Sequence, residues 1–289
     1  MNDLIIGCAN NYTWETLKYW VNSINKCGFE GDKFLILMNC DNESARKVIE
    51  AGFKVIGFGQ DNQGNLVYEP GKIPVHVERF IHIYEHLSRN DYRYVITTDV
   101  KDVVFQKNPI EWLENNLGDK GLVFASESMK YKDEPWGNQN LLDTYGPYIH
   151  EKYKDNTIYN VGVLAGRAEH MKHLAINIFT SAINRPIPIV DQAVFNVLIN
   201  TQPFKDVILY THEWACELGT VMDPSKIDKF RPNLLFSEPI WEGEQVLRPP
   251  LGLTPFPIFH QYDRVPELKK FVQEKYGQED ESLYFTYRT

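Results

Sequence analysis

Two carboxylates, Asp99 and Asp102, lie between two apolar segments of the chain. Residues 94–98 before them are β-branched or aromatic, as in a short buried strand, and residues 103–105 after them are apolar again. Burying ionised carboxylates is costly unless a cation or a hydrogen-bond donor compensates the charge. Open α/β sheets bind ligands at the carboxyl ends of their strands, so this pair indicates a divalent cation held by oxygen ligands. The spacing alone also fits two ordinary polar turn residues.

Other polar residues follow, interrupt or precede further apolar segments. The segments are the predicted strands 4–8, 121–125 and 158–166 and the predicted helix 193–199. The polar residues at these places are Asn10, Tyr12, Glu127, Asn160, Asp191 and Gln192. Two of them have simple structural explanations, because Asp191 could be a helix N-cap and a lone buried Asn usually hydrogen-bonds the backbone.

One histidine and one arginine could complete a site built on the two carboxylates. His260 follows a short apolar run, and a single histidine is more often a core residue than a ligand. However, two carboxylates need a third ligand from a distant segment, and imidazole suits manganese-type ions. Arg79 lies in the amphipathic helix predicted for residues 75–87, either as a surface residue or as a cation that reaches the cleft.

Strand and helix patterns alternate along most of the chain. Apolar strands are predicted at 4–8, 33–38, 53–58, 94–98 and 121–125, with helices between them. This rhythm is typical of an α/β fold with a mostly parallel sheet flanked by helices. No glycine-rich dinucleotide or P-loop motif follows any predicted strand.

Three stretches depart from this rhythm. Residues 59–73 are polar and rich in glycine, and we expect a loop there. Residues 129–157 also look like a loop; their aromatic and amide side chains suit either a sugar ring or packing over the core. An amphipathic helix and a polar tail, residues 266–289, follow the main domain of residues 1–265.

The composition limits the class of protein. The 289 residues carry a net charge of −9, which argues against a nucleic-acid partner held by phosphate neutralisation. The four cysteines lack metal-ligand spacing and are expected to be reduced thiols. No apolar run is long enough to span a membrane and the first residues do not resemble a signal peptide, so we expect a cytoplasmic protein. The sequence leaves open whether it forms a homodimer.

The ordered set of motifs resembles that of the metal-dependent GT-A glycosyltransferases. It looks most like the glycosyltransferase domain of procollagen lysyl hydroxylases and, more distantly, glycogenin-type enzymes. The motifs are Thr-Asp-Val-Lys-Asp-Val-Val-Phe at 98–105, Phe-Ala-Ser-Glu at 124–127, Tyr-Asn-Val-Gly-Val-Leu-Ala-Gly at 159–166, Asp-Gln at 191–192 and the late His260. The resemblance implies that residues 1–265 form a single GT-A domain, which is a Rossmann-like fold.

The resemblance also implies a metal centre and a donor site. Asp99, Asp102 and His260 would hold Mn²⁺, or Mg²⁺, against the diphosphate of a nucleotide-sugar. The family's His-Asn-Gly is replaced here by His260-Gln261-Tyr262. The other positions fall around the donor, with Ala9, Asn10 and Tyr12 at the nucleotide base, Arg79 at the diphosphate or sugar, and Asn160, Asp191 and Gln192 at the sugar.

The function implied is metal-dependent transfer of a sugar, from a donor expected to be a UDP-sugar, to a hydroxyl of a glycan, protein or small molecule. Retention at the anomeric carbon is expected; an inverting enzyme would need a base, for which Glu127 or Asp191 could serve. One alternative is a nucleotidyltransferase, although its usual basic glycine-rich loop is missing. Another is a non-catalytic sugar- or nucleotide-binding module on a degenerate transferase fold.

Overall fold

The computed structural model describes residues 1–58, 73–249 and 253–278. The predicted loop 59–73, apart from residue 73, and the polar tail from residue 279 lie outside the described residues. The described part contains a central sheet in the order β3-β2-β1-β4-β7-β6-β9-β13-β5, with β8 beside β6. Its strands are β1 (Asn2–Asn10), β2 (Asp32–Met38), β3 (Lys54–Phe58), β4 (Tyr92–Thr98), β5 (Val103–Phe105), β6 (Leu122–Lys130), β7 (Thr157–Arg167), β8 (Ile208–Leu209), β9 (Ala215–Glu217) and β13 (Ile258–His260).

The central sheet is mostly parallel. Strand β1 pairs in parallel with β2 and β4, β2 with β3, β6 with β8 and β9, and β9 with β13. Antiparallel pairs join β4 to β7, β6 to β7 and β5 to β13. The predicted fold class, an α/β fold with a mostly parallel sheet, is therefore confirmed.

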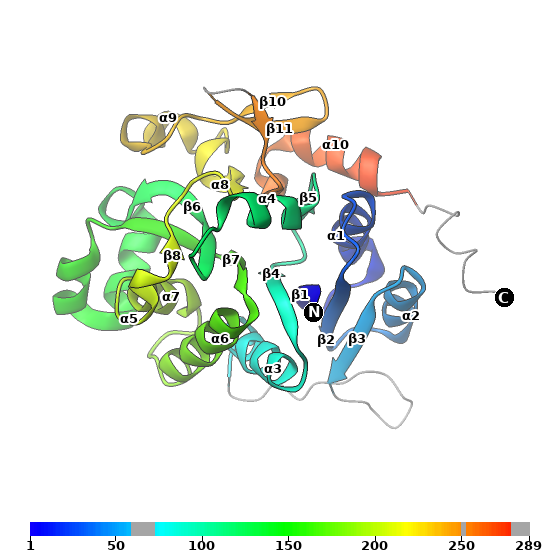
Figure 1. The fold of residues 1–289 in the computed structure, drawn as a ribbon. Helices are drawn as coiled ribbons and strands as arrows, with labels where there is room; N and C mark the ends of the chain where they lie inside the picture. The colour runs from blue at the N-terminus through cyan, green and yellow to red at the C-terminus, as the bar shows by residue number, and fades with distance from the viewer. Residues whose placement is uncertain (59–72, 250–252, 279–289) are drawn as a thin grey trace.

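Helices cover both faces of the sheet (Figure 1). Successive strand residues point to opposite faces, so Ile5 packs in one core cluster with Trp20 of α1, and Leu4 packs in the other with Phe80 of α3 and Met171 of α6. The helices are α1 (Trp14–Lys26), α2 (Asn42–Glu50), α3 (Val75–Arg89), α4 (Pro109–Asn116), α5 (Pro135–Tyr153), α6 (Ala168–Ala182), α7 (Asp191–Ile199), α8 (Leu218–Val221), α9 (Ile227–Phe230) and α10 (Pro266–Tyr276).

Smaller elements complete the described chain. A second sheet joins β10 (Ile240–Glu242), β11 (Gln245–Arg248) and β12 (Thr254–Pro255). Single 3₁₀ turns lie at Tyr131–Asp133, Phe204–Asp206, Arg231–Asn233 and Tyr262–Arg264. Helix α10 packs Leu268 and Val272 into a cluster with Val104 and Phe259, so it covers the β5–β13 edge of the sheet. The domain boundary predicted at residue 265 stays a prediction.

The prediction of a loop over residues 129–157 is wrong. Strand β6 continues to Lys130, and helix α5 fills most of the rest. The helix begins where Glu134 accepts hydrogen bonds from the next backbone N–H groups and where Pro135 occupies the first turn. Its pattern was hidden because Gly146, with φ 76°, and Pro147 kink it, and because amides and aromatics interrupt its apolar face.

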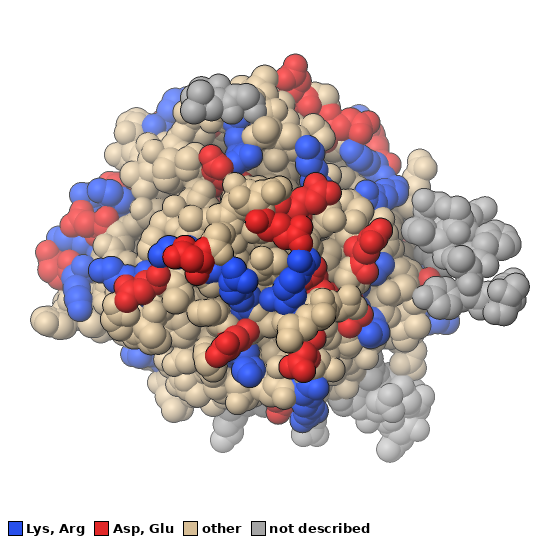
Figure 2. Space-filling view, viewed as in Figure 1, with Lys and Arg blue, Asp and Glu red and all other residues tan. Residues whose placement is uncertain are grey.

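The surface carries charges of both signs. Figure 2 shows Lys and Arg side chains interspersed with Asp and Glu across the viewed face, as on a solvated surface. Within the described residues, no helix combines the length and the apolar character that crossing a bilayer requires.

Candidate functional site

Asp99, Asp102 and His260 come together where strands β4 and β13 end and β5 begins. Asp99 directly follows β4, and the pairing of β5 with β13 sets Val103 opposite His260, which brings Asp102 beside the imidazole. His260 Nε2 lies 3.6 Å from Asp99 Oδ2 and 3.3 Å from Asp102 Oδ1. One ligand atom from each residue lies within 4.8 Å of the others. Two carboxylate oxygens and an imidazole nitrogen fit a divalent cation such as Mn²⁺ or Mg²⁺.

A glycine permits this close approach. A Cβ atom on Gly162 of β7 would lie 2.5 Å from His260 Cε1 and 2.8 Å from both Asn160 Oδ1 and Asp99 Oδ2. The backbone carbonyl of Gly162 also accepts a hydrogen bond from the Asp99 N–H, at 2.8 Å. Three side chains can therefore converge here only because residue 162 has none.

The turn after His260 has an unusual backbone conformation. Gln261 has φ 61°, a left-handed conformation that Asn and Gly adopt more readily than Gln. Its backbone N–H donates to the carbonyl of Asp102, at 2.8 Å, which fixes the turn against the carboxylate segment. The left-handed turn at Gln261 is thus part of the cluster's framework.

Glu217 lies behind His260 on the side away from the two aspartates. Parallel pairing of β9 with β13 sets Glu217 opposite His260, and Glu217 Oε2 lies 2.8 Å from His260 Nδ1. The Glu217 side chain is completely buried. Burial disfavours the imidazolium, but the carboxylates of Glu217 and Asp102 outweigh it and raise the pKa of His260 well above its usual value. The sequence reasoning missed Glu217; the only signal was a carboxylate inside the apolar run 214–218.

Arg79 of α3 joins the cluster of Asp99, Asp102 and His260 to another carboxylate, that of Asp191. Its guanidinium pairs with Asp99 Oδ1 and, at 3.1 Å, with Asp191 Oδ2. Although desolvation opposes ionisation, Arg79 and His260 hold the pKa of Asp99 below its usual value. Burial raises the pKa of Asp191, and Arg79 counteracts this only in part. The interpretation of Arg79 as a surface residue is wrong, because only 13% of its side chain is exposed.

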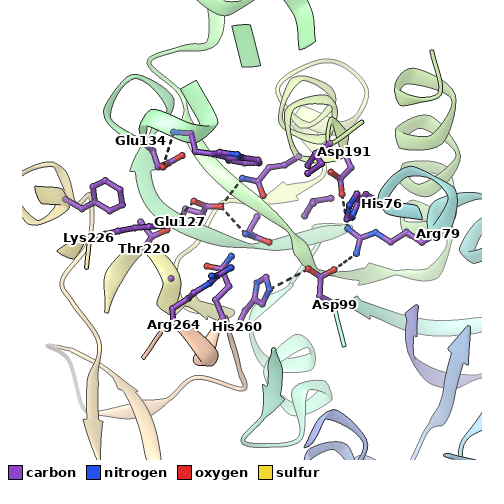
Figure 3. Close-up of a pocket in the computed structure, with 18 residues that line it drawn as sticks. His76, Arg79, Asp99, Glu127, Glu134, Asp191, Thr220, Lys226, His260 and Arg264 are labelled. Carbon is purple, nitrogen blue, oxygen red and sulfur yellow. Dashed lines mark hydrogen bonds and ion pairs between the residues drawn. The ribbon is translucent and has the colours of Figure 1, made fainter. Parts of the chain in front are cut away.

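Asp191 is not the N-cap that its position in the sequence suggested. Val190 holds the cap position of α7, and Asp191 is the first helical residue. Its carboxylate faces Arg79 at the wall of the pocket (Figure 3). The buried carboxylate is therefore compensated by a cation from α3 and lines the pocket instead of capping its own helix.

Glu127 is the centre of a buried hydrogen-bond network. Its Oε1 accepts from Asn160 Nδ2 at 3.0 Å and from Gln192 Nε2 at 2.9 Å, and its Oε2 accepts from Thr220 Oγ1 at 3.2 Å. Burial, followed by the negative charge of Glu217, raises the pKa of Glu127 to about 7 despite these donors. β6 continues past the predicted end at residue 125, so Glu127 lies within the strand.

Two adjoining pockets meet at these residues. The smaller, of about 190 Å³, is lined by Asn10, Tyr12, Lys101 and Asp102, among others. The larger, of about 390 Å³, is lined by Glu127, Asn160, Asp191, Gln192 and His260, among others (Figure 3). Both pockets share His76, Arg79 and Asp99. Ala9 is buried in the core, at the end of β1.

The structure adds lining residues that the sequence reasoning did not single out for the site. Apart from His76 of α3, they come from helix ends, short helices and turns, where no periodic pattern marks them. In the larger pocket they are His76, Glu134, Thr220, Lys226, Phe230 and Arg264. Trp136, which lies in the stretch predicted to be a loop, also lines this pocket.

Solved glycosyltransferase structures share this fold. The glycosyltransferase GlyE of Streptococcus pneumoniae TIGR4 matches with a TM-score of 0.56 and 13% identity, over 98% of this chain and 62% of that chain. The galactosyltransferase LgtC, solved with donor and acceptor sugar analogues, matches with a TM-score of 0.50 and 13% identity over 96% of this chain and 98% of LgtC. An active-site mutant of LgtC gives a TM-score of 0.52 at the same identity and coverage. This chain thus spans about 62% of the GlyE chain.

The comparisons by sequence found no match. No protein-family model matches the chain, and no curated protein matches it. At 13% identity the structural likeness shows the fold, which agrees with the GT-A fold that the sequence motifs implied. The finer resemblance to the lysyl hydroxylase transferase domain stays a prediction.

Proposed function

We propose that this protein is a metal-dependent glycosyltransferase that moves a sugar from a nucleotide diphosphate donor to a hydroxyl acceptor. The observation that carries the proposal is the cluster of Asp99, Asp102 and His260 where the two pockets meet. A nucleotide in the smaller pocket and a sugar in the larger one would place a diphosphate beside this cluster. We expect UDP as the nucleotide, with Tyr12 against the base and Asn10 beside it.

The residues have distinct roles in this proposal. A divalent cation on Asp99, Asp102 and His260 would stabilise the negative charge that develops on the departing diphosphate. Arg79 neutralises Asp99 and orients Asp191, whose carboxylate would face the anomeric carbon. Glu127, held by three side-chain donors, would accept hydrogen bonds from sugar hydroxyls.

The reaction balances without another reactant. The bond between the anomeric carbon and the diphosphate oxygen breaks, and a bond from that carbon to the acceptor oxygen forms. The acceptor proton passes to the departing diphosphate, so we propose retention of configuration. Inversion would instead need a protein base, and Glu127, with a pKa of about 7, is the carboxylate best suited to that role.

Thermal unfolding tests the proposal directly. The protein is heated with UDP or GDP, each with and without Mn²⁺, because a ligand that binds only the native state raises the midpoint. A shift with UDP that requires Mn²⁺, together with slow release of UDP from a UDP-sugar, supports the proposal. A shift without any turnover favours a non-catalytic binding module, and no shift with either nucleotide contradicts the proposed donor site.

A further inference from the structure

An exposed tryptophan lines the outer part of the larger pocket. Trp136 lies in the first turn of α5, and 52% of its surface is exposed although it is a large aromatic residue. Glu134 fixes this turn, because its carboxylate accepts hydrogen bonds from the backbone N–H of Trp136, at 3.3 Å, and of Gly137, at 2.5 Å. The backbone that carries the indole is therefore fixed beside the pocket by a capped helix end.

The surroundings of this tryptophan are polar. Glu134 and Lys226 lie at the side of the pocket away from Arg79 and Asp191 (Figure 3). Within the described residues, the Lys226 ammonium has no ion-pair partner among the contacts of the structure, so it is available to a ligand. Phe230 adds a second aromatic side chain to the lining.

This combination suits one class of acceptor. A pyranose ring stacks its C–H face on an aromatic ring while its hydroxyls bond to charged and amide groups. A lipid chain would need an apolar channel, whereas charged side chains and histidines make up half of this lining. A polar ligand with an apolar face satisfies both features of the pocket.

We propose that the outer part of the larger pocket is an acceptor subsite for a saccharide, which stacks on Trp136. The inference rests on the proposed glycosyltransferase function and extends it to the acceptor. The donor sugar would occupy the inner part beside Glu127 and Asp191, and the acceptor ring would lie between it and solvent. A hydroxyl of that ring would point inward to the anomeric carbon.

The experiment compares variants of two exposed aromatics on one helix. Trp136→Ala removes the platform and Trp136→Phe keeps an aromatic face. Tyr148→Ala is the matched control, because Tyr148 is 81% exposed on α5 and does not line the pocket. Transfer from UDP-glucose and UDP-galactose with Mn²⁺ is measured to methyl glycosides and disaccharides, and to peptides that carry serine, threonine or hydroxylysine.

We expect saccharides to be accepted and the KM for them to rise about tenfold in Trp136→Ala, as loss of an aromatic contact predicts. The saccharide KM of Trp136→Phe should stay within about threefold of the wild-type value, and that of Tyr148→Ala should equal the wild-type value. Transfer to the peptides alone, or an unchanged saccharide KM in Trp136→Ala, would overturn the inference.

A binding measurement separates this inference from the proposed function. Saturation-transfer NMR with a methyl glycoside detects the saccharide on the protein without any turnover. Saccharide signals that disappear in Trp136→Ala, in a protein that neither binds UDP nor hydrolyses the donor, would refute the transferase and retain the saccharide site. UDP binding with donor hydrolysis, but no saccharide signal in wild type, would refute the saccharide site alone.

Discussion

Replacing Glu217 with glutamine tests whether a buried charge behind His260 tunes the candidate metal centre. Glutamine keeps the size of the side chain and one hydrogen-bonding oxygen, so it removes the charge without leaving a cavity. A metal-bound histidine usually donates its second N–H to a partner, which fixes the ring and makes the ligating nitrogen more basic. Glu217 Oε2 lies 2.8 Å from His260 Nδ1, close enough for its charge to act on that nitrogen, although the two atoms are not aligned as a hydrogen bond.

The expected effect of Glu217→Gln is large. Loss of such an outer partner typically weakens metal binding about 10- to 100-fold, or about 1.4 to 2.8 kcal/mol. We expect the upper half of this range because the Glu217 side chain is completely buried, and solvent therefore does not screen its charge at His260.

The assay is a titration of the metal-free protein with Mn²⁺. The electron paramagnetic resonance signal of free Mn²⁺ reports how much of the ion stays unbound, and hence the dissociation constant. Glu213→Gln is the control, since Glu213 lies on the same segment with an exposed side chain that pairs with Arg248. Circular dichroism establishes that both variants fold. Equal Mn²⁺ affinity in wild type and a folded Glu217→Gln protein would refute the role assigned to Glu217.

Three further variants test the site. Asp102→Ala should fold, by circular dichroism, yet lose the Mn²⁺-dependent thermal shift with UDP; a retained shift would remove Asp102 from the metal site. The pKa of Glu127 rises on folding from 4.5 to about 7, so the free energy of unfolding should fall by about 3 kcal/mol as pH rises through that window. Urea denaturation at pH 4.5 and 8 should show a smaller fall in Glu127→Gln; equal falls would contradict the raised pKa. Gly162→Ala should weaken Mn²⁺ binding and destabilise the fold by about 1–3 kcal/mol, because its Cβ meets His260; unchanged Mn²⁺ affinity would show that the cluster can shift.

The sheet and the two carboxylates of the candidate metal cluster could be predicted because local patterns mark them. Buried parallel strands need continuous apolar runs, and these runs marked the strands near the N-terminus. Two carboxylates between such runs demand compensation, which singled out Asp99 and Asp102 before any contact was known. Glu127 and Asn160 were found for the same reason, as polar side chains in or beside apolar strands.

The rest depends on contacts between distant segments. Glu217 faces His260 only because β9 inserts between β6 and β13, and each of β9 and β13 has three residues, too few for a periodic pattern. The pairing of Arg79 with Asp191 joins residues 112 positions apart, and no local pattern encodes it. Helix α5 was missed because its kink and its amides obscure the 3.6-residue period on which such predictions rest.

Arg79 couples the two halves of the site through charge. Its guanidinium compensates Asp99 in the candidate metal cluster and Asp191 in the larger pocket at the same time. A divalent cation on Asp99 would supply that compensation itself and reduce the attraction between Asp99 and Arg79. The guanidinium could then bond more fully to Asp191 or to an incoming diphosphate, both of which are anionic. Binding of the divalent cation would thereby free the Arg79 guanidinium to bind the donor. We therefore expect the metal and the nucleotide-sugar to bind the native site cooperatively.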